Sequence, residues 1–356
     1  MNQLRNYLML TVLKGVALVL LVVVMVGGFI DFVGQLEDVG TGDYGLPQAI
    51  SYVFLRIPRT IFEVLPAAAL IGALLGLGNL AVHRELVVMR ASGISHFSML
   101  GALLLTGFGL MVVMVLLGES LAPSLGAYAR ELRTTALHDD VDLADGQSTW
   151  LKDGNRIINL RRPDASFGFE GGVFLFELDA AERVVSIARA ETADIEPTNE
   201  WVLGNYAETS FTADGVRATR APTLRRTYAL SPDLLGLSAV REDLLDTPSL
   251  ERYIEYLQSN DLEATRYLIA YWSRWASVAS VVLMTVLALP FVFGGLRSAG
   301  TGARVLVGLV IGLGYYAVVQ VSAEGGQVFD FEPIVVAWAP TAALAVVAAF
   351  ALLRIR

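Results

Sequence analysis

The side chains best suited to binding chemistry in this sequence form two sets, and the first is a pair of arginines. Arg130 and Arg133 lie three residues apart in a stretch with helical character, so both guanidinium groups project from one face. Two guanidinium groups on one side suit bidentate pairing with phosphate. The alternative is that they pair with the nearby Glu131 or with the phosphates of membrane lipids.

The second set lies in the polar stretch 83–93, where Glu85 is a lone acid beside Leu86, Val87 and Met89. The residue types favour a short amphipathic helix that ends near Gly93. An apolar surface with one charge gives a partner both contact area and a fixed register. The stretch is therefore either a handle for a soluble partner or a plain connector, and its own residues do not separate the two.

Six apolar runs surround these residues, and each is long enough to cross a bilayer core, which takes roughly 20 helical residues. The composition agrees, because 54% of the chain is hydrophobic and only 17% is charged. The run 6–30, interrupted by Lys14, is interpreted as a retained span rather than a cleaved signal peptide, since an even number of spans then follows. The expected spans are 6–30, 61–82, 97–118, 267–293, 305–323 and 333–353.

Between the third and fourth spans the pattern changes to short runs of β-forming residues separated by turn signals such as Asp153-Gly154-Asn155. This alternation predicts an all-β domain of the sandwich or jelly-roll type. Thr247-Pro248 then opens a helix, with Thr247 as its N-cap, that we expect at the membrane interface. The predicted organisation is 1–138 with three spans and the helix 83–93, 139–246 as the β domain, and 247–356 with the interfacial helix and three spans.

The basic residues of the short loops predict the orientation in the membrane. They gather on one side of a six-span topology and therefore mark the cytoplasmic side. The set comprises Arg5, Lys14, Arg84, Arg90, Arg297, Arg304, Arg354 and Arg356. The β domain then faces outward, and a bacterial inner membrane with a periplasmic domain is the simplest location.

The sequence excludes several kinds of chemistry. It has no cysteine, and neither of its two lysines, Lys14 and Lys152, follows a glycine as a phosphate-binding P-loop requires. It also lacks the G-x-S-x-G and H-E-x-x-H motifs, and its three histidines have no ligand spacing. We therefore expect no catalytic residue, metal site or cofactor in this chain. Any transport must be driven by a partner.

Charged residues near the spans give no sign of an internal energy source. Glu63, Arg274 and Glu324 lie near span ends and are interpreted as interfacial residues.

Residues 119–266 carry 26 acidic and 15 basic side chains, a balance that argues against nucleic-acid binding.

Small residues recur at a four-residue spacing in two spans. Gly72 and Gly76 lie in the second span, and Gly308 and Gly312 lie in the fifth. This spacing lets helices approach closely, and it gives modest support for a second membrane subunit.

Several motifs together resemble the lipopolysaccharide-export permeases of the YjgP/YjgQ type, the LptF/LptG family. The resemblance covers nearly the whole chain in order, and the form E-L-V-V-M-x-A-S-G looks like the LptG members rather than the LptF members. The motifs are PAAALIGALLGLG at 66–78, ELVVMRASG at 85–93, GESLAP at 118–123, WLKDGN at 150–155 and FGGLRS at 293–298.

The resemblance implies a transport subunit that pairs with the permease LptF, packing through the first and fifth spans. Two copies of the ATPase LptB would bind beneath and hold ATP and Mg, and LptC would receive the lipopolysaccharide from the β domains. The helix 83–93 would lie in a groove of LptB, with Glu85 as the acidic coupling residue. The implied contacts to LptB are Arg84, Glu85, Leu86, Val87, Met89 and Arg90.

The resemblance also implies the ligand site. Arg130 and Arg133 match family positions that contact the lipid A head group, and Arg59 is a weaker third candidate. Family members often carry lysines just after the first span, whereas this chain has Asp31, Glu37 and Asp38. Either a divalent cation bridges Asp31 or its neighbours to phosphate, or these acids point away from the ligand.

Readings from other classes remain open at this point. The chain is alternatively the paralogous LptF subunit, or a permease of another ATP-driven lipid or lipoprotein exporter. Lipoprotein-release permeases usually have four spans with the outward domain after the first, which fits this chain less well. A membrane scaffold without a transport role would not need Glu85, Arg130 and Arg133 together.

Overall fold

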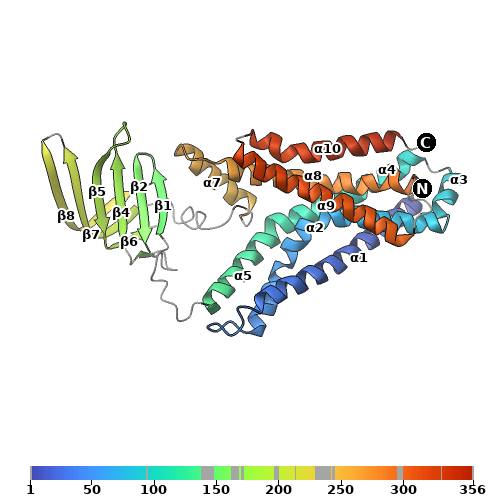
Figure 1. Cartoon of the computed structure of the whole chain (residues 1–356), viewed down its shortest axis with the longest axis horizontal. Helices are drawn as coiled ribbons and strands as arrows, with labels where there is room; N and C mark the ends of the chain where they lie inside the picture. Colours follow the sequence, from blue (N-terminus) through green and yellow to red (C-terminus); the bar gives the residue numbers. More distant parts are fainter. Residues whose placement is uncertain are drawn as a thin grey trace. The chain divides into compact units, whose positions relative to one another are not determined.

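The chain folds as two units in the computed structural model (Figure 1). Residues 1–137 together with 265–356 form the membrane unit, and residues 138–264 form the β unit. The structure describes residues 2–93, 95–137, 148–161, 168–169, 172–195, 200–212, 214–228, 242, 245–294, 300–329 and 331–354. Arg297 and Arg356 of the predicted basic set lie outside these residues.

Six helices of the described chain are long and apolar enough to cross a membrane, which confirms the predicted spans. In chain order the membrane unit contains α1 (Asn2–Gln35), α2 (Leu46–Val82), the short α3 (Glu85–Ala91), α4 (His96–Leu116), the π-helical η1 (Leu117–Leu121), α5 (Ala122–Leu137), α8 (Thr265–Phe293), α9 (Thr301–Val328) and α10 (Pro333–Leu353). Both chain ends and α3 lie at the same end of this unit (Figure 1).

The second span is much longer than predicted. We expected the second span to begin at residue 61, but α2 already begins at Leu46 and runs for 37 residues. Pro47 occupies the first turn, where its missing N–H costs nothing, and Pro58 and Pro66 lie inside the helix. The third span is also part of a longer helical rod, since α4, η1 and α5 follow one another without a break from His96 to Leu137.

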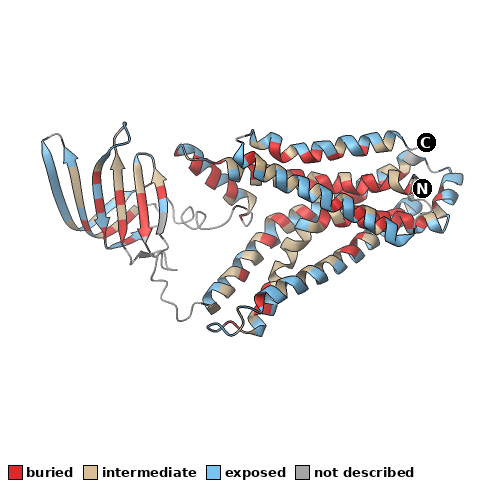
Figure 2. Ribbon diagram, in the orientation of Figure 1, coloured by how far each residue is buried: buried red, intermediate tan, exposed pale blue. Residues whose placement is uncertain are grey.

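The core of the membrane unit is built around α2 and α8 (Figure 2). In the most apolar stretch of each span, 67% of the residues are buried in α2 and α8, but only 11% in α1 and α9. Leu70, Leu74 and Leu77 of α2 pack in one apolar cluster with Val281 and Met284 of α8. Helices α1 and α9 therefore present wide apolar faces to their surroundings.

The glycine motifs serve contacts within the unit. A Cβ at Gly72 would overlap the backbone of Val16, and a Cβ at Gly76 would lie 2.8 Å from the carbonyl oxygen of Thr11. These two glycines bring α1 and α2 to direct backbone contact. In α9, Gly308 and Gly312 pack closely on the side chains of Ile71 and Ala67 of α2. Because these glycines pack within the membrane unit, they are not evidence for a second membrane subunit.

The β unit contains one curled antiparallel sheet, which confirms the predicted all-β domain between the third and fourth spans. Its strands are β1 (Ser148–Asp153), β2 (Arg156–Arg161), β3 (Gly168–Phe169), β4 (Val173–Leu178), β5 (Val184–Ala190), β6 (Thr192–Ile195), β7 (Glu200–Thr212) and β8 (Gly215–Thr227). The order is β1-β2-β4-β5-β7-β6-β3, and β8 pairs with β7. The two longest strands of the described sheet, β7 and β8, have 13 residues each and pair along their whole length.

Helix α7 (Thr247–Ser259) belongs to the β unit, although we had grouped it with the last three spans. Its N-cap is Asp246 rather than Thr247, since the Asp246 carboxylate accepts from the backbone N–H of Ser249. The Tyr256 hydroxyl donates to the Lys152 carbonyl at 2.8 Å, and Asn260 accepts from the backbone N–H of Gly154 at 2.7 Å. These bonds attach α7 to the β1–β2 hairpin.

Candidate functional site

The first candidate site is α3, whose seven residues connect two spans. Two of its apolar side chains point into the membrane unit: Leu86 is 3% exposed and Met89 is 6% exposed, and both belong to the apolar cluster of the spans. Residues three apart lie on one helical face, so this packing fixes the rotation of α3. Arg84 precedes the helix with φ +62°, a left-handed conformation that turns the chain sharply after α2.

The outward side of α3 carries a different set of residues. Val87 and Val88 are 49% and 63% exposed, and Arg84 and Arg90 are also exposed. The predicted apolar surface of Leu86, Val87 and Met89 is therefore divided, because only Val87 of the three faces outward. The second exposed apolar side chain of α3 is Val88, which was not among the residues predicted from the sequence.

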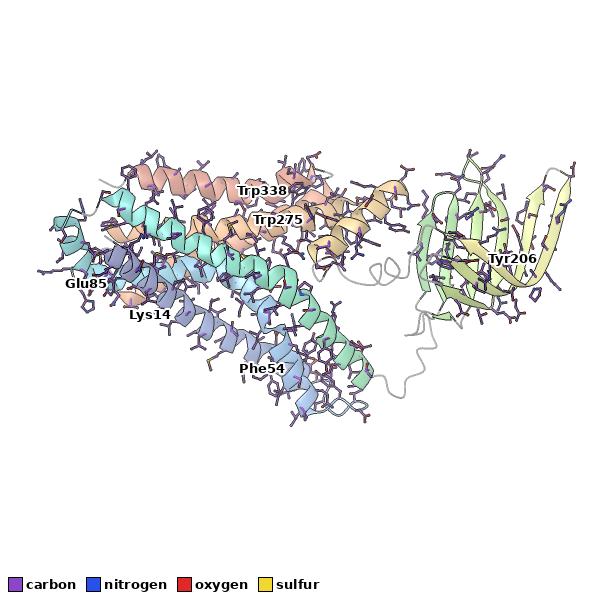
Figure 3. All side chains as sticks on the ribbon, turned by 180° about the vertical axis from the view of Figure 1, so that it is seen from behind. Lys14, Phe54, Glu85, Tyr206, Trp275 and Trp338 are labelled. Atoms are coloured by element: carbon purple, nitrogen blue, oxygen red, sulfur yellow. The ribbon has the colours of Figure 1, made fainter. Side chains whose placement is uncertain are left out.

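Glu85 lies half-buried at the start of α3, and Figure 3 shows it at the end of the membrane unit. The Tyr7 hydroxyl of α1 donates a hydrogen bond to Oε2 of Glu85 at 2.9 Å. This bond holds the carboxylate beside the first span, and no feature of the sequence indicated it. Glu85 is thus placed where a partner on the outward side of α3 can also contact it.

The second candidate site joins α1, α2 and α5 and is called the Tyr52 cluster: Asp31, Asp38, Tyr52, Arg56 and Arg133. Arg133 donates to Oδ2 of Asp38 through Nη2 at 2.6 Å and Nε at 3.2 Å. Arg56 pairs with Asp31 at 3.6 Å. Both guanidinium groups lie over the Tyr52 ring, 5.7 Å and 5.9 Å from its centroid for Arg56 and Arg133. Two cations therefore face one aromatic ring.

The cluster includes only part of the predicted arginine set. Arg133 is in it, whereas Arg130 lies one turn earlier on α5, half-buried, with Nε donating to the Gly126 carbonyl. Arg59 pairs with Glu63 within α2. Arg56 was not predicted, although its spacing of four from Tyr52 on a helix was a readable signal.

The acids after the first span have arginine partners. Asp31 pairs with Arg56 and Asp38 pairs with Arg133, which is neither of the two arrangements considered from the sequence. No group of three or more His, Cys, Asp or Glu side chains suited to a metal ion is found in the described part of the chain. Because arginine partners compensate them, these acids are compatible with a phosphate site.

A buried tyrosine supports this end of the unit. Tyr44 is fully buried in the α1–α2 connection, and its hydroxyl donates to Gln35 at 2.9 Å. Burial raises the pKa of Tyr44, and the nearby Arg133 acts in the opposite sense. The backbone N–H of Asp43 donates to the Ala136 carbonyl of α5 at 2.8 Å, so the connection is also attached to α5.

A further ion pair joins the third and fourth spans. Arg274 of α8 pairs with Glu119 of η1 at 3.5 Å, and the two side chains are 11% and 25% exposed. We had interpreted Arg274 as an interfacial residue and had given Glu119 no role. The pairing was not visible in the sequence because the partners are separated by the whole β unit.

Comparison with known proteins gives one consistent result. The family described as "Lipopolysaccharide export system permease LptF/LptG" matches residues 6–354. The lipopolysaccharide export system permease protein LptG of Escherichia coli (strain K12) is 33% identical over 354 residues, covering 99% of this chain and 98% of the relative. The protein of the same name from Haemophilus influenzae is 30% identical over 341 residues, covering 96% and 95%.

Proposed function

Because the chain belongs to the LptF/LptG family of lipopolysaccharide export permeases, we propose that it forms the LptG-type half of an ATP-driven transporter. It is a multi-pass inner-membrane protein and a transport subunit rather than an enzyme. The proposed partners are the permease LptF, two copies of the ATPase LptB, and LptC. ATP and Mg would be held by LptB, and the β unit would lie in the periplasm.

The packing of α3 is the observation that carries the ATP-driven part of this proposal. Leu86 and Met89 are buried in the same apolar cluster as residues of α1, α2, α4 and α8. Close-packed interiors transmit displacement rather than absorb it. A partner that moves the outward face of α3 would therefore move the spans, and this face offers Val87, Val88, Arg84 and Arg90 together with Glu85.

The surface left by α1 and α9 supports a second permease subunit. These two spans are the least buried of the six in the described chain, and their apolar faces are wide. A bilayer alone would tolerate such faces, but a related permease packed against them would enclose the ligand between two membrane units. The proposed contact with LptF therefore runs along α1 and α9.

The Tyr52 cluster and Arg130 are proposed to hold the lipid A phosphates. Arg133 and Arg56 bring two planar guanidinium groups together over one ring, the geometry that favours phosphate. Arg59 would contribute only after leaving Glu63, so its role is secondary. Asp31 and Asp38 pair with these two arginines, and a ligand phosphate would displace Asp38 from Arg133.

A pull-down with matched variants tests the coupling. The tagged chain is expressed in its own membranes, solubilised gently, and compared with Glu85→Lys and with Glu255→Lys, which places the same charge change at an exposed position of α7. We expect Glu85→Lys to lower recovery of the ATPase by about tenfold while the second permease is retained. Glu255→Lys is expected to leave both unchanged.

Three outcomes would contradict the proposal or part of it. Normal ATPase recovery with Glu85→Lys would remove the coupling role of α3. Absence of lipopolysaccharide-stimulated ATP hydrolysis in the reconstituted wild-type complex would contradict the transport role itself. Recovery of LptG instead of LptF as the second subunit would reassign the chain to the LptF position.

A further inference from the structure

We propose that the Glu119–Arg274 ion pair, together with η1, sets the orientation of α5 and thereby positions Arg130 and Arg133 for the ligand. Both partners of the pair are positioning residues, since neither is placed at the ligand site. This inference rests on the proposed function for what α5 binds, but its structural part is independent of any ligand.

The first observation is the π-helical segment itself. η1 occupies Leu117–Leu121 in the middle of the continuous rod from His96 to Leu137. A π-helical turn contains an additional residue, so it shifts the angular position of every side chain that follows it. Such turns are rare and are found frequently at functional sites. The faces that α5 presents therefore depend on whether η1 keeps this geometry.

The second observation is that η1 is held from two sides. Gly118 is buried, and a Cβ at that position would lie 2.5 Å from the Phe62 ring of α2. The next residue, Glu119, reaches Arg274 of α8 at 3.5 Å. Neighbouring residues of one turn thus contact two different helices. This arrangement fixes both the position of η1 and its rotation.

The third observation is the position of the Glu119–Arg274 pair along the line of contact, or seam, between α4 and α8. A Cβ at Gly107 of α4 would contact Val282 of α8 at 3.0 Å, so the two helices are in close contact earlier in the seam. Glu119 and Arg274 close the same seam further along both helices. The charges are largely withdrawn from water, where Coulomb attraction is stronger than at an exposed surface. Removing one of them leaves the other poorly hydrated, which favours a rearrangement of η1.

The consequence reaches the arginines through a rigid helix. Arg130 follows Glu119 by eleven residues, about 17 Å of helix. At the far end, α5 is attached to the α1–α2 connection by Arg133 and Asp38. Between these attachments Ala129 is 1% exposed, whereas Ala127 is exposed. A rotation of α5 would exchange the burial of these two alanines and turn both arginines.

Thiol accessibility measures this rotation directly, because the natural chain has no cysteine. Ala129→Cys and Ala127→Cys are introduced singly into the full chain, assembled with its partner subunits in nanodiscs, and treated with a water-soluble maleimide. In the otherwise natural background we expect Cys at 129 to be protected and Cys at 127 to react. Adding Glu119→Gln or Arg274→Gln is expected to raise the reaction rate at 129 about tenfold through the increased exposure.

Three controls make the result specific. Glu131→Gln removes an exposed acid from α5 itself and is expected to leave position 129 protected. Arg274→Lys keeps a cation and is expected to preserve the protection that Arg274→Gln removes. Ala102→Cys, at a position of α4 that is 2% exposed, is expected to stay protected in every background and reports general unfolding.

A ligand measurement then connects the rotation to binding. In complexes without an introduced cysteine, Glu119→Gln is expected to weaken the affinity for purified lipopolysaccharide about tenfold. Glu131→Gln is expected to leave this affinity unchanged. Unchanged affinity in Glu119→Gln would overturn the positioning role. The positioning role would also be overturned if position 129 stayed protected in Glu119→Gln, or if Arg274→Lys lost as much protection as Arg274→Gln. Exposure of positions 102 and 129 together would overturn it as well.

The failure of this inference and the failure of the proposed function are distinguishable. If the wild-type complex does not bind lipopolysaccharide, the proposed function fails, and the maleimide pattern still decides whether the pair orients α5. If the wild-type complex binds lipopolysaccharide normally and position 129 stays protected in Glu119→Gln, only the inference fails.

Discussion

At one end of the membrane unit α3 is anchored by Leu86 and Met89, whereas at the other end Arg133 joins α5 to Asp38 of the α1–α2 connection. The first contact is apolar and buried. The second is an ion pair between partly exposed side chains, with Arg133 39% and Asp38 29% exposed. Apolar burial is not screened by salt and has no competing anion, whereas an exposed ion pair is screened by salt and can be replaced by another anion.

This difference matches the two proposed tasks. A site that transmits displacement benefits from contacts that do not exchange, and α3 has them. A site that takes up and releases a phosphorylated lipid benefits from contacts that an incoming anion can replace. The comparison therefore predicts that variants at the two ends will differ in size of effect and in salt dependence.

The largest effect is expected when the apolar anchor of α3 is removed. Leu86→Ala creates a cavity in the core of the membrane unit and should lower its free energy of unfolding by about 2–5 kcal/mol. Val87→Ala, at the exposed neighbouring position, should change it by less than about 0.5 kcal/mol. Unfolding of the two variants in bicelles by a denaturing detergent measures the difference. Equal destabilisation would mean that α3 is not anchored by its inward face.

An intermediate effect is expected from Asp38→Asn. The exposed pair itself contributes only about 0–1 kcal/mol to stability, so the variant should unfold nearly as the natural chain does. Its affinity for lipopolysaccharide should rise severalfold at low salt, because Arg133 no longer has a competing carboxylate. Titration at several salt concentrations would detect this gain and its decline with screening. A loss of affinity would show that Asp38 aids the ligand instead of competing with it.

The smallest effect is expected from Tyr44→Phe, which removes the buried bond to Gln35. One hydrogen bond contributes about 1 kcal/mol, and its loss should not depend on salt. Because the folded pKa of Tyr44 is raised above the ordinary value of about 10, its contribution is fully present below pH 10 and is lost only as the pH rises through the folded value. Comparing natural and variant stability at neutral pH in low and high salt measures it. A strong salt dependence would contradict the assignment.

The sequence predicted the elements that depend on local composition. Six apolar runs were sufficient to locate the spans, and the short β-forming runs between the third and fourth spans located the β domain. The length of α2 was missed because the second span was expected to begin only at residue 61, after Pro58. In the structure it lies inside the helix, where neighbouring helices can compensate for its missing donor.

The candidate sites were predictable only in part, because side-chain direction and pairing depend on the whole fold. The sequence indicated a short helix around Glu85, but it could not tell that Leu86 and Met89 face inward while Val88 faces outward. The pairs of Asp31 with Arg56 and of Glu119 with Arg274 connect residues far apart in the chain. Neither local propensity nor periodicity contains information on such contacts.

The backbone contact of α1 with α2 has a consequence for how the two candidate sites affect each other. Helix α1 bonds to Glu85 through Tyr7 near its start and pairs with Arg56 through Asp31 near its end. Between these two points, Val16 of α1 lies directly against Gly72 of α2. One helix thus belongs to both sites. If both proposed sites are occupied, thermodynamic linkage makes their communication reciprocal: the factor by which the proposed ATPase changes the affinity for lipid at one end must equal the factor by which lipid changes the affinity for the ATPase at the other.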